Sequence, residues 1–186
     1  MSEIIFESIY PDENVLYDAL YSVVIWTKPK NYLEIGVNEG KSMSMVVRNT
    51  NLKRLVLCDN WGGTYGGRGR GNHSHIEPML KKLDYKGEVR FLDGDSRILI
   101  PDFIKENQPE FDLVLVDGDH SYNTAWLDLM NAWKLVKKGG YIIMDDLIHK
   151  DHMYLNDCVD TFIKFMNAKE IYKNIERPNG VVVIQK

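Results

Sequence analysis

The sequence predicts an α/β fold: a doubly wound, mostly parallel sheet of seven strands with a C-terminal antiparallel hairpin. Apolar runs typical of strands alternate with amphipathic helical segments along most of the chain, a pattern of parallel sheets covered by helices on both faces. The 186 residues suffice for one full domain and are too few for two ordinary ones. We therefore expect a single domain, residues 1–186.

The first half of the chain pairs helices with strands. Pro11 and Asp12 indicate where the first helix begins, and Pro101 and Pro109 make the end of the fourth helix irregular. The N-terminal helix, within residues 1–30, is expected to pack on the sheet. The predicted helices cover residues 12–27, 42–50, 75–83 and 97–107, and the predicted strands cover residues 31–36, 53–59 and 87–95.

The second half continues the alternation and ends differently. The sequence Lys137-Lys138-Gly139-Gly140 is expected to close the helix before the fifth strand. Asn179-Gly180 is a strong hairpin signal, so the last two strands should be antiparallel neighbours. The predicted strands cover residues 111–117, 141–146, 169–176 and 180–185, and the predicted helices cover residues 123–136 and 152–167.

Composition excludes several classes of protein. A net charge of -4 with scattered Lys and Arg argues against a nucleic-acid surface. The N-terminal segment lacks the apolar core of a secretory signal, and no stretch approaches the length of a membrane span, so we expect a cytoplasmic protein without membrane contact. Cys58 and Cys158 lack metal-ligand spacing and are expected to be buried free thiols.

Two acidic clusters directly follow apolar strands. They are Asp117-Gly118-Asp119-His120, after FDLVLV, and Asp145-Asp146, after YIIM. Ligands of open parallel sheets bind beyond the carboxyl ends of the strands, so these carboxylates should face one cleft. Each cluster alone is also compatible with a simple turn or helix cap. Their equivalent positions favour a site with converging oxygen ligands.

The first strand-to-helix turn, LEIGVNEGKS, is the other candidate for ligand binding. It lacks the second glycine of the dinucleotide fingerprint at Asn38, and it is one residue too short for a phosphate loop. Glu34 and Glu39 would also repel phosphate. Because GKS followed by LVLVD imitates the two NTPase motifs, a P-loop-like NTPase stays as an alternative.

The pattern Glu34-x-Gly36-x-x-x-Gly40 resembles motif I of the class I S-adenosylmethionine-dependent methyltransferases, which have a Rossmann-like fold. VDGDHSY and LVKKGGYIIMDD look like later motifs of the small metal-dependent O-methyltransferases that act on sugars and antibiotics. The resemblance implies that Asp59 accepts the ribose hydroxyls and that Asp95 and Ser96 border the adenine. The implied cofactor-binding residues are Glu34, Gly36, Gly40, Asp59, Asp95, Ser96 and Asp117.

The acidic clusters suit O-methylation of a small-molecule acceptor with S-adenosyl-L-methionine. Asp117, Asp145 and Asp146 offer hard oxygen ligands, which Mg²⁺ or another divalent cation prefers. Such an ion would lower the pKa of the acceptor hydroxyl. Asp119 is the preferred base by resemblance, whereas His120 is the better base by its ordinary pKa. A catalytically silent cofactor-binding module remains an alternative.

Residues 61–72 form a glycine-rich segment that we expect to be flexible and to lie on the cofactor side of the sheet. Arg68 and Arg70 could close over an anionic acceptor, while Trp61 or Tyr65 stacks on a ring. The sequence is shorter at the N-terminus than the antibiotic-modifying enzymes that it resembles, which often carry substrate-covering helices there. We therefore expect the acceptor pocket to be open or to be completed by another subunit of a homo-oligomer.

Overall fold

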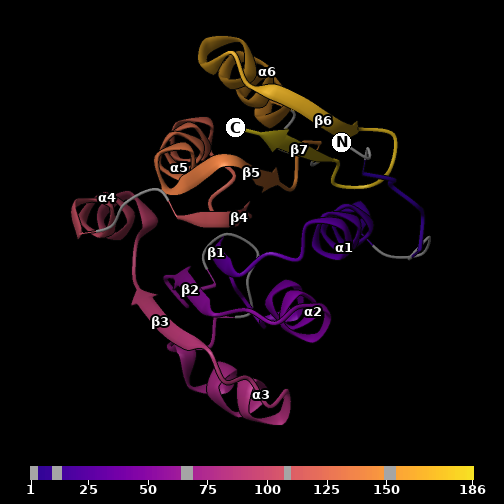
Figure 1. Cartoon of the computed structure of the whole chain (residues 1–186). Coiled ribbons are helices and arrows are strands. Elements are labelled where there is room, and N and C mark those ends of the chain that lie inside the picture. Colours follow the sequence, from indigo (N-terminus) through magenta and orange to yellow (C-terminus); the bar gives the residue numbers. More distant parts are fainter. Residues whose placement is uncertain (1–3, 10–13, 64–68, 107–109, 149–153) are drawn as a thin grey trace.

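A seven-stranded sheet forms the centre of the computed structural model, in the order β3-β2-β1-β4-β5-β7-β6 (Figure 1). The structure describes residues 4–9, 14–63, 69–106, 110–148 and 154–186 of the chain. Strands β1 to β5 pair in parallel, and β7 is antiparallel to both β5 and β6, so the predicted fold class is confirmed. The strands are β1 (Asn31–Ile35), β2 (Arg54–Asp59), β3 (Glu88–Asp93), β4 (Phe111–Val116), β5 (Val136–Met144), β6 (Lys169–Asn174) and β7 (Val181–Gln185).

Helices cover both faces of the sheet (Figure 1). One face carries α1 (Val15–Thr27), α2 (Lys41–Asn49) and α3 (Ile76–Lys82), with a short 3-10 turn, η1 (His73–His75), before α3; the other carries α4 (Ser96–Glu106), α5 (Tyr122–Leu135) and α6 (Tyr154–Met166). Two buried cores result, one on each side. In β1, for example, Leu33 packs into one core and Tyr32 into the other. The apolar strand sequences follow from this burial on both faces.

In helix α1, Val15, Ala19 and Leu20 are completely buried in the same core as residues of β1 and β7. Upstream of it, the ring of Phe6 stacks on Tyr172 of β6, with ring centroids 4.2 Å apart. The N-terminal segment is therefore joined to the far edge of the sheet. In the part of the chain that the structure describes, no helix combines the length and apolar character needed to cross a membrane.

The predicted boundary between the fifth helix and the fifth strand is wrong. Helix α5 ends at Leu135, and residues 137–140, expected to close it, belong to β5. Val136 pairs with Phe111 and Tyr141 pairs with Leu113, so the intervening residues bulge out of the ladder. Val136 is completely buried, and its pairing in the sheet outweighs the cap signal of the following Lys and Gly residues.

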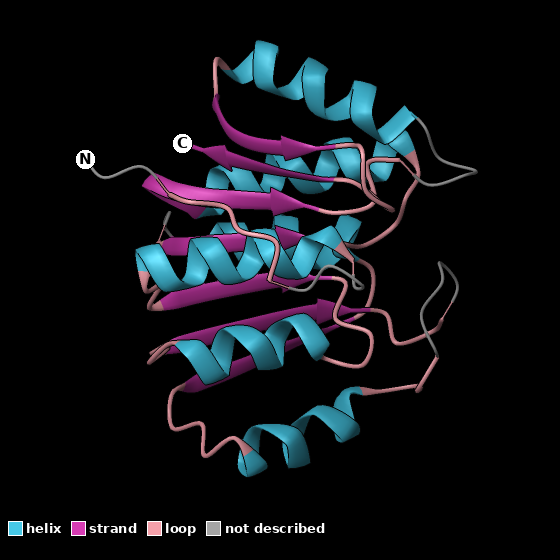
Figure 2. Ribbon diagram, turned by 90° about the vertical axis from the view of Figure 1, so that its right-hand side faces the viewer, coloured by secondary structure: helices cyan, strands magenta, loops and turns pink. Residues whose placement is uncertain are grey.

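The parallel strands all point their carboxyl ends to one edge of the sheet, on the right in Figure 2. The β6–β7 hairpin was correctly predicted, and Asn179 and Gly180 both have positive φ, 71° and 65°. Backbone hydrogen bonds from Leu147 and Ile148 to Gly180 and Asn179 bring the end of this hairpin against the segment that follows β5. The hairpin thereby reaches the edge of the sheet where the parallel strands end.

Candidate active site

A cavity of about 900 Å³ lies at the carboxyl edge of the parallel strands. It lies between the turns that follow β1, β2, β3, β4 and β5. Nine residues predicted for the site line it: Gly36, Asp59, Asp95, Ser96, Asp117, Asp119, His120, Asp145 and Asp146. Glu34 and Gly40 do not. The structure thus brings most of the predicted residues to one cavity.

Asp59 holds the glycine turn after β1. Its Oδ2 atom accepts hydrogen bonds from the backbone amides of Val37 and Asn38, at 2.7 and 2.8 Å, and its Oδ1 accepts from Trp61 at 2.6 Å. The turn also passes close to β4, because a Cβ at Gly36 would lie 1.8 Å from the carbonyl oxygen of Asp117. These contacts fix the shape of the cavity wall before any ligand binds.

Glu34 lies beneath the wall in a buried hydrogen-bond network. Its Oε2 accepts from the Tyr32 hydroxyl at 2.7 Å, and its Oε1 accepts from the Ser42 hydroxyl. Burial raises the pKa of Glu34 to about 8, against the opposing effect of these two hydrogen bonds. Gly40 lies just before α2, where a Cβ would meet Ile76 at 2.7 Å. Both residues therefore support the turn after β1 without lining the cavity.

The next wall is formed at the start of α4. Asp95 accepts from the backbone amide of Arg97 at 2.9 Å and also pairs with its guanidinium, which lowers the pKa of Asp95. Behind this wall, Asp128 of α5 is completely buried, and neither of its carboxyl oxygens has a hydrogen-bond partner. Burial raises the pKa of Asp128 to about 7, against the opposing effect of the nearby Ser96 hydroxyl. No motif in the sequence points to Asp128 as a residue beside the cavity.

The acidic end of the cavity holds a group of ligand-type atoms. Among the described residues, Asp117, His120 and Asp146 each offer an atom within 4.8 Å of the others. His120 Nε2 lies 2.9 Å from Asp146 Oδ2, and this contact raises the pKa of His120. Burial, followed by the charges of Asp145 and Asp146, raises the pKa of Asp117 well above its usual range. The group can hold protons or a cation.

Asp145, predicted as a ligand, is not part of that group of three but lies beside it. Its Oδ2 accepts a hydrogen bond of 2.8 Å from Asn14 Nδ2, whereas its Oδ1 is buried without a partner. Asp146 Oδ1 is likewise buried and unpaired. Burial and the charge of Asp146 raise the pKa of Asp145 to about 8. Asp119 lines the same end, and its Oδ1 accepts from the Ser121 amide at 2.8 Å.

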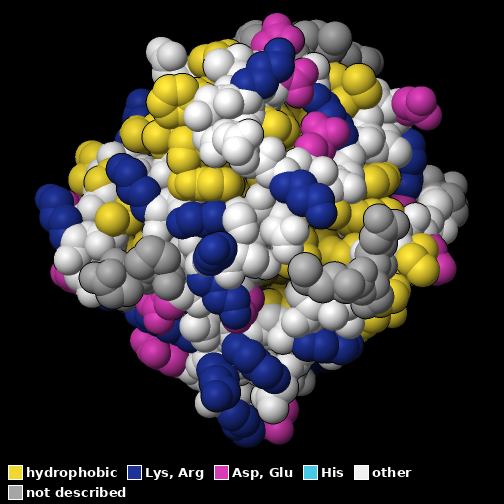
Figure 3. Space-filling model, turned by 45° about the horizontal axis from the view of Figure 1, so that its top comes forward, with side chains coloured by type: hydrophobic (Ala, Val, Ile, Leu, Met, Phe, Trp, Pro, Cys, Tyr) yellow, Lys and Arg dark blue, Asp and Glu magenta, His cyan; other side chains and the backbone are white. Residues whose placement is uncertain are grey.

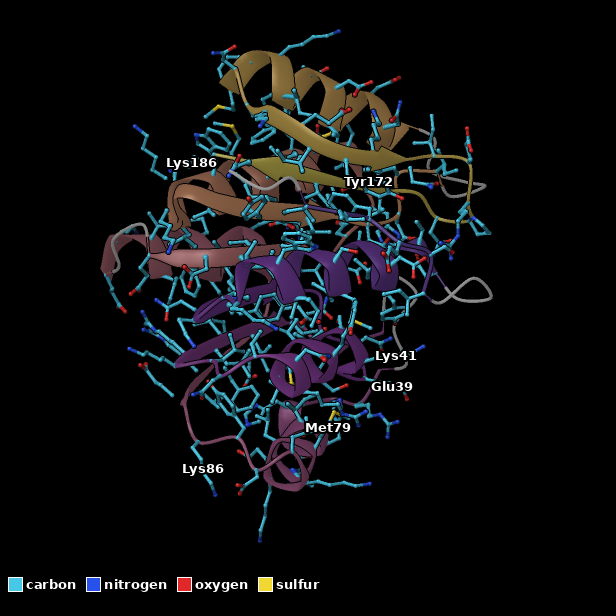
Figure 4. The ribbon with its side chains drawn as sticks, turned by 45° about the vertical axis from the view of Figure 1, so that its right-hand side comes forward. Glu39, Lys41, Met79, Lys86, Tyr172 and Lys186 are labelled. Carbon is cyan, nitrogen blue, oxygen red and sulfur yellow. The ribbon has the colours of Figure 1, made fainter. Side chains whose placement is uncertain are left out.

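The loop after β2 is fixed at its base. Trp61 is buried, and its indole nitrogen donates to Asp93 at 2.9 Å. Arg70 pairs with Glu39 at 2.6 Å, next to a second hollow of about 460 Å³. Figure 4 shows Glu39 and Lys41, which line this hollow, near the start of α2, with Met79 on α3 below. Tyr65 and Arg68, suggested for substrate contact, lie outside the described residues.

Some residues that line the cavity carry no recognisable signal in the sequence. Asn14 and Tyr17 come from the start of α1, and Asn179 comes from the β6–β7 hairpin. Both segments are far from the strand-end motifs in sequence and reach the cavity only through tertiary packing. The two cysteines, by contrast, are buried free thiols as predicted, and Cys58 contributes to the cavity wall.

The strand order and the cavity at the carboxyl edge of the parallel strands are those of a Rossmann-like domain. A family model described as a methyltransferase domain matches residues 33–147, which include every strand-end motif from Glu34 to Asp146. The chain belongs to this methyltransferase-domain family. The match favours the methyltransferase interpretation of the glycine turn over the NTPase alternative.

Individual relatives are more distant. An uncharacterized protein, R132, of Acanthamoeba polyphaga mimivirus is 28% identical over 120 residues, covering 62% of this chain and 50% of the relative. A caffeoyl-CoA O-methyltransferase of Populus kitakamiensis is 25% identical over 133 residues, covering 62% of this chain and 56% of the relative. The chain thus spans about half the length of these curated relatives.

Solved structures agree on the fold. The O-methyltransferase TomG from Streptomyces achromogenes, involved in tomaymycin synthesis and solved with S-adenosylmethionine, superimposes with a TM-score of 0.68 at 16% identity. The superposition covers 97% of this chain and 81% of that protein.

Proposed function

We propose that the protein transfers a methyl group from S-adenosylmethionine to a hydroxyl group of a small molecule such as a sugar or natural product, with the help of a divalent cation. The observation that carries the proposal is the acidic group of Asp117, His120 and Asp146 at one end of the cavity, while Gly36 and Asp59 lie on its wall. A methyl acceptor and a donor can thus meet in one space.

The cavity fits the proposed cofactor in size and charge. A volume of about 900 Å³ is within the range of small-molecule sites. Asp59 and Asp95 provide carboxylates on the wall, which suits the ribose hydroxyls and the positively charged groups of this cofactor. The relatives named O-methyltransferases support the same reading.

The acidic end fits a divalent cation such as Mg²⁺. Asp145 and Asp146 each keep one buried oxygen without a hydrogen-bond partner, and buried carboxylates of this kind need a proton or a positive charge. Oxygen donors from Asp117, Asp145 and Asp146 would hold the ion, with His120 beside them. A bound cation would polarise the acceptor hydroxyl and lower its pKa.

The surrounding side chains then divide the remaining tasks. His120 Nε2 lies 2.9 Å from Asp146 Oδ2, and this contact raises the pKa of His120, so His120 holds its proton more tightly than an ordinary imidazole and is less available as the base. Asp119 uses Oδ1 to accept from the Ser121 amide, which orients the carboxylate and leaves Oδ2 to accept the proton of the acceptor hydroxyl. The wall around Gly36 and Asp59 would hold the donor in the same cavity as that hydroxyl.

Calorimetry with S-adenosylhomocysteine tests the cofactor part of the proposal. We expect binding in the micromolar range, and the Lys41→Ala variant should bind equally well, because a methyl donor has no phosphate for Lys41 to hold. Absence of binding at millimolar ligand would contradict the proposal. Binding without transfer to any acceptor would instead indicate a catalytically silent module.

The reaction and its cation are tested with labelled cofactor. Incubation with cell extracts, followed by mass spectrometry, should reveal a labelled small molecule with an added methyl group. Transfer should be fast in Mg²⁺ and strongly reduced after EDTA; equal rates would remove the ion from the mechanism. A cytoplasmic location and a homo-oligomer that completes the acceptor pocket remain predictions.

A further inference from the structure

Asn14 makes two hydrogen bonds at the start of α1. Its Oδ1 accepts from the backbone amide of Leu16 at 3.0 Å and thereby caps the helix. Its Nδ2 donates to Oδ2 of Asp145 at 2.8 Å, across 131 positions of the chain. One amide side chain therefore joins the N-terminus of a helix to a carboxylate of the acidic end.

We propose that Asn14 is a positioning residue that fixes the orientation of Asp145 for cation binding; the inference rests on the proposed function. The hydrogen bond occupies Oδ2 of Asp145 and leaves Oδ1, buried and without a partner, as the oxygen that the carboxylate offers. Carboxylates that bind metals commonly depend on such hydrogen bonds from outside the ligand set.

The fold holds Asn14 in place. Val15, the first residue of α1, is completely buried, and so is Ala19 one turn later. Asp18 accepts from the Ile9 amide at 2.8 Å and pairs with Arg177 of the hairpin. Because the helix is anchored on both sides, its cap cannot move away from Asp145 without disturbing the core.

Only some side chains can make both contacts. An amide has an acceptor for the helix cap and a separate donor for the carboxylate. Serine caps helices nearly as well as asparagine but is shorter and has no amide hydrogens. The Asn14→Ser variant therefore keeps the cap and loses the contact with Asp145. A matched control is Asn72→Ser, because Asn72 also caps a helical turn, accepting from Ser74 at 2.9 Å, without contacting the acidic group.

The test measures binding of Mn²⁺ alone to the full chain by calorimetry, with S-adenosylhomocysteine binding measured separately. We expect Asn14→Ser to weaken Mn²⁺ binding by about tenfold or more, the usual effect of removing an outer partner of a metal ligand. Binding of S-adenosylhomocysteine should be unchanged, which also shows that the variant folds. Asn72→Ser should bind both ligands as the original chain does.

Equal Mn²⁺ affinities for Asn14→Ser and the original chain would overturn the positioning role while leaving the proposed function intact. An original chain that binds neither Mn²⁺ nor S-adenosylhomocysteine would overturn the proposed function as well. If Asn14→Ser lowers the affinities for Mn²⁺ and S-adenosylhomocysteine equally, the residue has a general structural role and the inference is wrong.

Discussion

The backbone of Gly36 lies so close to Asp117 that any other residue at position 36 would place its Cβ 1.8 Å from the Asp117 carbonyl oxygen. Gly36 also has a φ of 87°, which favours glycine. The neighbouring strand end thus requires a glycine at the start of the turn after β1. The turns after β1 and β4 must keep this contact for the cavity to form.

We therefore expect Gly36→Ala to lower the free energy of unfolding by at least about 3 kcal/mol, because both the clash and the backbone strain oppose it. Gly139→Ala is the matched control: its φ is 79°, but nothing lies within 4 Å of the added Cβ. That variant should lose only about 1 to 2 kcal/mol from backbone strain. Urea denaturation measures both, and equal losses would show that the contact with Asp117 is unimportant.

Glu34 provides a second test, because it is buried away from the cavity. With a pKa of about 8 it is mostly neutral at pH 7, so Glu34→Gln should change the affinity for S-adenosylhomocysteine by less than about threefold. Glu34→Ala should be destabilised by about 2 to 3 kcal/mol, since the hydroxyls of Tyr32 and Ser42 lose their acceptor. A large loss of affinity in Glu34→Gln would instead indicate that the cofactor needs the negative charge.

The free energy of unfolding should fall as the pH rises from acidic to weakly basic values. The pKa values of Glu34 and Asp145 rise to about 8 from 4.5 and 3.8, and that of Asp128 rises from 3.8 to about 7. The folded chain therefore binds these protons more tightly than the unfolded chain, and the free energy of unfolding falls as pH rises through that window. The raised pKa of His120 acts in the same direction, since its contribution is present in acid and is lost as pH rises.

We expect the urea midpoint of the ligand-free protein to be higher at about pH 5.5 than at about pH 8.5. Asp128→Asn should reduce this difference, because an amide cannot ionise in the buried site. A midpoint that rises between these two pH values would show that other groups control the stability.

Arg177 and Asp18 form an ion pair that joins the β6–β7 hairpin to α1. The Asp18 side chain is only 4% exposed, so removal of the arginine leaves a buried carboxylate short of positive charge. Arg177→Met should lower the free energy of unfolding by about 2 to 3 kcal/mol, less than for a fully buried pair because Arg177 is 23% exposed. Lys105→Met, which breaks an exposed pair with Asp102, is the control and should leave the urea midpoint unchanged.

The architecture of the sheet, and the residues that lie at the ends of its strands, could be predicted from the sequence. Asp59, Asp117 and Asp145 follow apolar runs directly, and parallel pairing places such positions at one edge regardless of detail. The orientation of the Glu34 side chain could not be predicted from the sequence. Its place behind the cavity wall depends on the packing of Tyr32 and Ser42 around it. The identity of a residue in a sequence motif does not show whether its side chain faces a cavity or lies behind the cavity wall.

Other features depend on contacts that no local pattern encodes. Asn14 and Asn179 reach the cavity because α1 packs on β7 and the hairpin folds back over the end of β5. The start of β5 at Val136 depends likewise on its pairing with Phe111, which a helix-cap signal cannot reveal. Propensities describe neighbours in sequence, whereas these outcomes are decided by neighbours in space.

Charge is distributed unevenly between the two edges of the sheet. Carboxylates surround the cavity. The face in Figure 3, in contrast, displays many Lys and Arg side chains. At the starting ends of the strands, Arg54 and Lys137 form ion pairs with acidic side chains. In the proposed reaction the sulfur of the methyl donor would be positive only until the methyl group leaves, so the carboxylates around the cavity would attract the donor more strongly than the spent product. Under the proposed function, release of the product would then be favoured after transfer, and a higher ionic strength would reduce the difference between the affinities for donor and product.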